Sequence, residues 1–264
     1  MAEVTAKDVA ALRQATGAGI LDCRKALQEN GGDLEAATKW LREQGLSGAS
    51  KRADRTRAEG AVSVVVNGKE GAVVALECET DFVAKSNDFV ALVDNLADAC
   101  ATFGEAGIAR FAAEIDQIKV TLKENIAVGR HEQFVAGDDS LLESYLHVQN
   151  GRGVNGVLIE VVGGSAELAH DIAVHIAFAR PDYLTREQVP ASAIEAERET
   201  IKTIALKEGK PEAQLEKIIE GRLNGWFKER VLLEQSYARD EKKTISQLLD
   251  GASIRRFAQV VVGA

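Results

Sequence analysis

The sequence predicts an α+β protein with a helical domain at the N-terminus and a larger part built from small antiparallel sheets covered by helices. Three observations predict it. Residues 1–45 carry apolar side chains at helical spacing, β-branched runs flank Asn67-Gly68, and a second pair of runs flanks Asn150-Gly151. The 264 residues exceed an average single domain, so at least two units are expected.

The first 45 residues predict three short helices. Gly17-Ala-Gly19 separates the first helix from the second, Asn30-Gly31-Gly32 ends the second, and Asp33 is placed to cap the third. The apolar stripes consist of Val4, Val9 and Leu12, then Ile20, Leu21, Ala26 and Leu27, then Leu34, Ala37, Trp40 and Leu41. Residues 45–57 are polar, basic and rich in small residues, which is typical of a linker. We therefore place a domain boundary near residue 55.

The next part of the chain predicts a β-hairpin covered by a helix. Residues 60–66 and 71–78 are two β-branched runs joined by an Asn-Gly turn, which is the strongest short hairpin signal. An amphipathic helix is expected over 88–103, and a late strand over 126–136. These elements would form one three-stranded antiparallel sheet in a subdomain that spans 56–140.

The same order of elements recurs, which indicates an internal repeat. Residues 145–150 and 156–161 form the second expected hairpin, and a helix follows over 166–179. A late strand over 254–262 completes a second three-stranded sheet. This second subdomain spans 141–264.

Residues 190–222 interrupt the second subdomain with two charged helices. A glycine ends the first helix and a proline begins the second at Glu208-Gly209-Lys210-Pro211, which predicts an antiparallel helical hairpin, or short coiled coil. The narrow apolar seams contain Ile194, Ile201 and Ile204 on one helix, and Leu215, Ile218 and Ile219 on the other. The hairpin is therefore expected to project from the sheets.

Composition excludes several classes of protein. The chain has 32 basic and 41 acidic residues, and the net charge of −9 argues against direct nucleic-acid binding, which needs concentrated lysine and arginine. No apolar run approaches the length of a membrane span, and the N-terminus has no signal-peptide core. Three cysteines at no metal or redox spacing are typical of reduced thiols. We expect a cytoplasmic protein with no membrane partner.

The sequence offers little enzyme chemistry. The GxxxxGK[ST] phosphate-binding loop is absent, and the four histidines lack metal-ligand spacing, so neither a cofactor nor a bound metal is expected. No catalytic residue is assigned. A thiol-dependent enzyme stays open as an alternative, and it would need Cys78 or Cys100 to be exposed and reactive.

One segment is unusual, because a strand runs into a helix through the acidic and aromatic turn Thr80-Asp-Phe-Val-Ala-Lys85. Function often lies on such connections. In the simpler interpretation, Thr80 and Asp81 cap a helical turn while Phe82 packs inward. The residues of the turn alone leave both interpretations open.

Two motifs resemble a known family, the bacterial elongation factor Ts family of guanine-nucleotide exchange factors for elongation factor Tu. They are Thr80–Lys85 and Leu12-Arg-x-x-Thr-Gly-Ala-Gly-Ile-x-Asp-Cys-Arg-Lys-Ala-Leu27. Weaker support comes from Asn125-Ile126, Tyr145-x-His147, His175, Lys210-Pro211 and Glu220-Gly-Arg222. The resemblance covers almost the whole chain, and it implies that residues 1–55 form a ubiquitin-associated-like (UBA-like) three-helix domain.

The resemblance also implies a mechanism and a set of contacts. The Thr80, Asp81, Phe82 and Val83 turn would enter the partner near its Mg²⁺ and phosphate site and promote release of GDP without making or breaking a bond. The resemblance implies further contacts through Leu12, Arg24, His147 and His175. Arg24 stands where lysine is usual in the family, which keeps the charge but changes the hydrogen-bond geometry.

Two questions stay open from the sequence. A homodimer and a hetero-complex of two copies each are both compatible with the chain. The alternative to exchange is a binding adaptor, because many such proteins share the three-helix domain.

Overall fold

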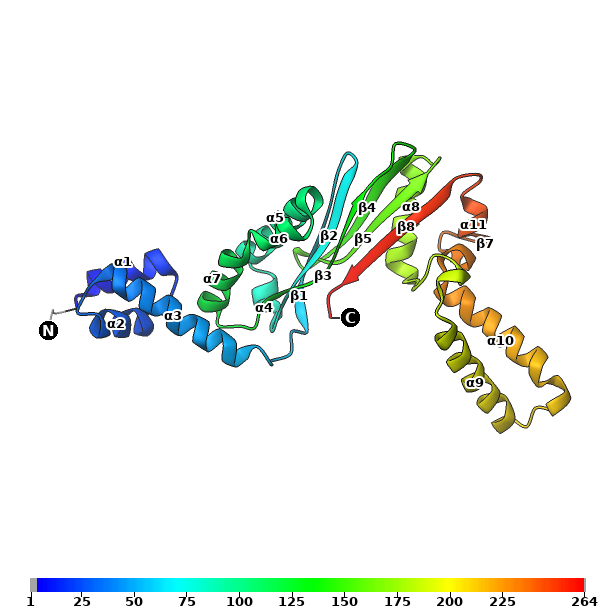
Figure 1. The fold of residues 1–264 in the computed structure, drawn as a ribbon, viewed down its shortest axis with the longest axis horizontal. Coiled ribbons are helices and arrows are strands. Elements are labelled where there is room, and N and C mark those ends of the chain that lie inside the picture. The colour runs from blue at the N-terminus through cyan, green and yellow to red at the C-terminus, as the bar shows by residue number, and fades with distance from the viewer. Residues whose placement is uncertain (1–3, 264) are drawn as a thin grey trace.

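Helices and antiparallel strands follow one another along an elongated molecule (Figure 1). The structure is a computed structural model that describes residues 4–263. The N-terminal helices lie at one end, two sheets lie in the middle, and a pair of long helices projects at the other end (Figure 1). The architecture is therefore α+β, as the sequence predicts.

Three helices make up the N-terminal region: α1 (Ala6–Thr16), α2 (Ile20–Glu29) and α3 (Leu34–Arg52). Thr5 begins α1 with a capping box, in which its side chain accepts from the Asp8 amide and the Asp8 carboxylate accepts from the Thr5 amide. Gly17 ends α1 at φ 69°, a left-handed conformation that favours glycine. The buried cluster between the helices contains Val9, Leu12, Ala18, Cys23, Ala26, Leu27, Ala37 and Leu41.

The predicted linker over residues 45–57 is wrong for most of its length, because α3 continues to Arg52. This part of α3 packs on α7 (Ala112–Leu122), so a tertiary contact stabilises a helix that the local composition does not indicate. Gly45 makes the close approach possible, since a Cβ there would lie 2.3 Å from Cγ1 of Val120. The N-terminal helices are therefore docked on the rest of the chain.

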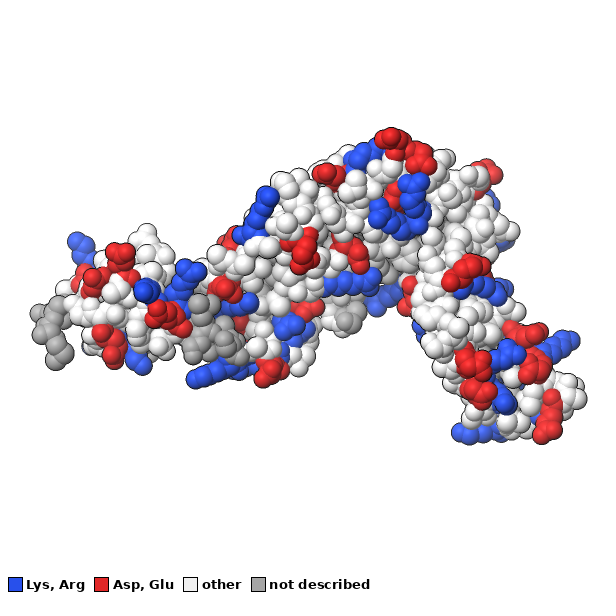
Figure 2. Space-filling model, viewed as in Figure 1, with Lys and Arg blue, Asp and Glu red and all other residues white. Residues whose placement is uncertain are grey.

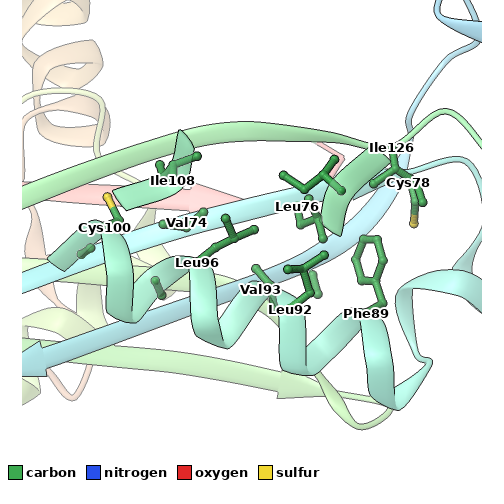
Figure 3. Close-up of a cluster of buried hydrophobic side chains, with 14 of the residues drawn as sticks. Val74, Leu76, Cys78, Phe89, Leu92, Val93, Leu96, Cys100, Ile108 and Ile126 are labelled. Atoms are coloured by element: carbon green, nitrogen blue, oxygen red, sulfur yellow. The ribbon is translucent and has the colours of Figure 1, made fainter. Parts of the chain in front are cut away.

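The first sheet has the order β1-β2-β3, with antiparallel pairing throughout. It contains β1 (Glu59–Asn67), β2 (Glu70–Cys78) and β3 (Ala127–Val135), which confirms the predicted hairpin and late strand. Helix α5 (Asn87–Phe103) lies along one face and points its apolar side chains at the sheet (Figure 3). The short helices α4 (Asp81–Ala84) and α6 (Glu105–Ala109) complete this half.

The second sheet has the order β4-β5-β8 and repeats the first. It contains β4 (Ser140–Gln149), β5 (Arg152–Val162) and β8 (Ser253–Val261), and α8 (Ala166–Ala179) covers it. Both the second hairpin and its late strand are confirmed.

The two sheets pack against each other through their remaining faces. Buried side chains from both sheets share one cluster, which contains Val62, Val73, Ala75, Phe134, Leu142, Leu158, Ala258 and Val260. Gly153 brings β5 close to β1, since a Cβ there would lie 2.1 Å from the carbonyl oxygen of Val62. The two halves therefore share this apolar cluster, in addition to the cluster that each sheet forms with its own helix.

The helical hairpin consists of α9 (Ala191–Lys207) and α10 (Leu215–Arg230). It is longer than predicted, because Leu223 and Phe227 continue the buried seam towards Val189 and Val231. Acidic and basic side chains cover its projecting end (Figure 2). The remaining elements, which the sequence analysis does not predict, are the 3-10 turns η1 (Arg186–Gln188), η2 (Glu212–Gln214) and η3 (Leu232–Glu234), the ribbon β6 (Ser236–Tyr237) with β7 (Asp240–Thr244), and α11 (Ile245–Leu248).

None of the helices in the described part of the chain combines the length and the apolar content that a membrane crossing needs.

Candidate functional site

The segment Thr80–Lys85 forms a short, well-bonded helical turn between β2 and α5. Thr80 is the N-cap of α4, and its hydroxyl accepts a hydrogen bond from the Val83 amide at 3.4 Å. The amides of Ala84 and Lys85 donate to the carbonyl oxygens of Thr80 and Asp81. The capping role predicted for Thr80 is confirmed, and the backbone of the turn is hydrogen-bonded within the unbound chain itself.

Phe82 projects from this turn into solvent, with 83% of its surface exposed. The interpretation in which Phe82 packs inward is therefore wrong. Val83 turns the other way and packs against the core under α5, while Ala84 is buried within that core. A large aromatic side chain on a fixed turn is suited to contact another protein, because little flexibility is lost when it binds.

Asp81 lies beside Phe82 and is partly exposed. Its carboxylate pairs with Lys85, with 2.5 Å between Oδ2 and Nζ. The hydrogen bond from Lys85 lowers the pKa of the Asp81 carboxyl below its usual range. The turn therefore presents an ionised carboxylate next to an exposed ring.

The resemblance implies partner contacts through two N-terminal residues, Arg24 and Leu12, and the structure places one at the surface and the other in the core. Arg24 is exposed on α2. Leu12 is only 1% exposed and lies in the core of the three helices, so its side chain is not available at the surface of the unbound chain. Ile20 and Leu21, expected in the buried stripe, are 58% and 76% exposed at the start of α2. Their exposure fits the geometry of the helix, because Cys23, Ala26 and Leu27 already fill the buried face of α2.

His147 is exposed on β4, and its ring stacks beside Tyr145 with the ring centres 6.5 Å apart. Phe178 on α8 is 79% exposed and was missed by the sequence analysis. Tyr145, His147 and Phe178 line one surface hollow of about 610 Å³ together with Val174. Polar groups, among them Asn155 and Arg180, also line the hollow, so the second half of the repeat carries a surface of mixed polar and aromatic character.

His175 belongs to the interior, so its side chain is not available at the surface of the unbound chain. Its Nδ1 accepts from the Ala238 amide at 3.2 Å, which leaves the proton on Nε2, and Nε2 donates to Gln235 Oε1 at 3.0 Å. Burial lowers the pKa of His175, which favours the neutral ring. His175 therefore fixes the segment after α10 against α8.

The cysteines do not support a thiol-dependent enzyme, and that alternative is wrong. Cys78 and Cys100 are buried, and burial raises their pKa values to about 12 and about 11. The thiolate that a nucleophile needs is then almost absent at neutral pH. Within residues 4–263, no group of three or more histidine, cysteine or acidic side chains is placed to hold a metal ion.

A hydrogen-bonded turn with an exposed aromatic ring, and two further surfaces with exposed apolar side chains, are typical of a protein that acts by contact with another protein. The family model for elongation factor TS matches residues 79–264. Over the full length of both chains, the sequence is 45% identical to elongation factor Ts of Leifsonia xyli and 43% identical to that of Renibacterium salmoninarum. It is 42% identical to elongation factor Ts of Paenarthrobacter aurescens over 98% of this chain and 97% of that one. The chain belongs to the elongation factor Ts family, the nucleotide exchange factors of elongation factor Tu.

Proposed function

We propose that the chain releases GDP from elongation factor Tu by inserting Asp81 and Phe82 near the Mg²⁺ and phosphate site of the partner. The exposure of Phe82 on a fixed turn is the observation that supports this proposal most directly. Nucleotide phosphates are typically held by a cation and by backbone amides. A wedge that moves these groups raises the dissociation rate of GDP and breaks no bond, so the chain is an exchange factor and not an enzyme.

Two other surfaces fit the same partner. Arg24 with its exposed neighbours Ile20 and Leu21 would dock the N-terminal helices, and His147 with Phe178 would dock the second half of the repeat. Leu12 and His175 would act indirectly, because each orders the elements that carry these surfaces. Contacts at three separated places would orient the turn as it enters the partner.

The proposal includes a division of the chain. Residues 1–55 form a UBA-like domain, 56–140 and 141–264 are the two halves of the repeat, and 190–222 belong to the inserted hairpin. We place the protein in the cytoplasm, with elongation factor Tu as partner and without direct binding to nucleic acid or membrane. Assembly as a homodimer or as a complex of two copies of each protein is compatible with this scheme.

Release of a fluorescent GDP analogue from purified elongation factor Tu tests the proposal. Substoichiometric amounts of the chain should accelerate release with multiple turnovers. Linkage requires the reverse effect as well, so excess GDP should weaken the complex by the factor by which the chain weakens GDP. Tight complex formation with no acceleration of release at any concentration would contradict the proposal.

Shortening the helical hairpin should leave exchange within about threefold, a change below about 1 kcal/mol. A short Gly-Ser turn in place of residues 203–217 removes the charged end and keeps Ile201, Ile219 and Phe227, which hold the base together. Nucleotide release and light scattering on this variant measure exchange and self-association. A large loss of exchange from a well-folded variant would place the end of the hairpin in the partner interface.

A further inference from the structure

Three consecutive residues between α7 and β3, Lys123-Glu124-Asn125, contact three different parts of the chain. Lys123 ends α7 with a left-handed backbone, at φ 59°. Its ammonium group pairs with Asp22 of α2, with 2.7 Å between Nζ and Oδ2. We refer to residues 123–125 as the connector.

Glu124 holds the backbone just before α4. Its Oε2 accepts hydrogen bonds from the amides of Glu79, at 3.0 Å, and Thr80, at 3.2 Å. Its Oε1 accepts from the Thr80 hydroxyl at 2.5 Å. Since that hydroxyl also accepts from the Val83 amide, the carboxylate of Glu124 fixes the hydroxyl that caps α4.

Hydrogen bonds run in both directions between the connector and the segment before α4, and Asn125 adds contacts to a third segment. The Asn125 amide donates to the Glu79 carboxylate at 2.6 Å, while Glu79 donates its own amide to Glu124. The side chain of Asn125 is almost buried and donates to the carbonyl oxygens of Ala53 and Arg55, at 2.9 and 2.7 Å. The connector therefore ties the turn that carries Phe82 to the segment that follows α3.

We infer that Glu124 is a positioning residue for nucleotide exchange, an inference that rests on the proposed function of the turn. Phe82 makes no contribution to the core, so the direction in which it points depends on the backbone of α4. Glu124 accepts three hydrogen bonds from the two residues just before α4, namely from the amide of Glu79 and from the amide and hydroxyl of the N-cap Thr80. Val83 and Ala84 anchor α4 to the core independently, so loss of Glu124 loosens the turn and leaves the fold in place.

A positioning role for Glu124 predicts a specific change in the kinetics of GDP release. Docking of the other surfaces does not involve Glu124, so the concentration of factor that gives half-maximal stimulation should change little. Insertion of Phe82 is needed for release itself, so the maximal release rate should fall. A residue that only stabilised the fold would instead lower the melting temperature and the amount of active factor.

The test measures GDP release over a range of factor concentrations for Glu124→Ala, Glu124→Gln and, as a control, Glu132→Ala on the exposed side of β3. We expect Glu124→Ala to lower the maximal rate at least fivefold, with the half-saturating concentration within twofold of wild type. Glu124→Gln keeps one oxygen acceptor and should recover part of the rate, and Glu132→Ala should match wild type. Thr80→Val removes the hydroxyl that contacts both Glu124 Oε1 and the Val83 amide but keeps the two amide bonds to Glu124 Oε2, so it should lower the maximal rate by a smaller factor.

Combination with Phe82→Ala separates this inference from the proposed function. If Glu124 acts through Phe82, the double variant should release GDP no more slowly than Phe82→Ala alone. Equal maximal rates for wild type and Phe82→Ala would overturn the proposed function itself. If Phe82→Ala is impaired while the Glu124 variants keep the wild-type maximal rate, or if the two losses multiply in the double variant, the positioning role is overturned.

Discussion

Replacement of Phe82 by alanine is expected to lower stimulated GDP release at least tenfold while the free energy of unfolding stays within about 1 kcal/mol of wild type. The two effects separate because the ring is 83% exposed in the unbound chain. Removing it creates no cavity and leaves the cap and the backbone bonds of α4 unchanged. In the complex, the same ring would be the group that displaces the phosphate-binding elements of the partner.

Phe89 provides the matched control for this variant. It lies on α5, the helix that follows α4 in the sequence, but is buried between α5 and the first sheet (Figure 3). Phe89→Ala should cost about 3–5 kcal/mol of stability, as truncation of a buried phenylalanine usually does. Nucleotide release and denaturant unfolding are measured on both variants. A loss of several kcal/mol in Phe82→Ala, or undiminished release, would show that Phe82 has a structural role and does not act as a wedge.

Much of the fold could be predicted from the sequence because its signals are local. The Asn-Gly turns and the β-branched runs around them specify both hairpins within about twenty residues each, and the order of elements repeats. The continuation of α3 could not be predicted in this way. It packs on α7, where Gly45 lies against Val120 and Arg52 donates to the Lys119 carbonyl oxygen, and these residues are far apart in the sequence.

In the candidate site, too, some features follow from the local sequence and others depend on tertiary structure. The Thr80–Lys85 turn stands out by its composition, and the resemblance assigns its role. Exposure is a tertiary property, so the resemblance implies partner contacts for Leu12 and His175 although both are buried, whereas the apolar stripe of the first helix already includes Leu12. Phe178 was missed because an apolar residue on an amphipathic helix gives no local sign that it lies outside the core.

Glu160 on β5 illustrates a different consequence of tertiary structure, a fully buried carboxylate that the sequence gives no reason to expect. Oε1 accepts hydrogen bonds from the Ser140 hydroxyl at 2.6 Å and from Arg255 at 2.8 Å, and Oε2 accepts from Arg256 at 2.7 Å. The Gly137 amide adds a fourth bond. Glu160 therefore joins β5 to β8 and to the loop before β4.

The electrostatic environment of Glu160 predicts that the folded chain loses stability at acid pH. Burial alone would raise the pKa of its carboxyl, but the hydrogen bonds from Ser140, Arg256 and Arg255 outweigh burial and lower the pKa to about 2. A carboxyl whose pKa is lower in the folded chain stabilises the fold fully above its unfolded value of 4.5. That contribution, about 3 kcal/mol, should be lost as the pH falls from roughly 5 to 2.

Glu160→Ala is accordingly expected to cost about 3–5 kcal/mol at pH 7, because it leaves two arginines and a buried hydroxyl without their common partner. Glu216, which is exposed and pairs with Arg198 on the hairpin, provides the control, and Glu216→Ala should cost less than about 1 kcal/mol. Denaturant unfolding at pH 7 and at pH 3 is measured on wild type, both alanine variants and Glu160→Gln. The destabilisation caused by either Glu160 substitution should shrink at pH 3, because wild type has by then lost most of the same contribution. A Glu160→Gln variant as stable as wild type at pH 7, or a penalty that does not depend on pH, would show that the carboxylate charge does not hold the two strands and the loop together.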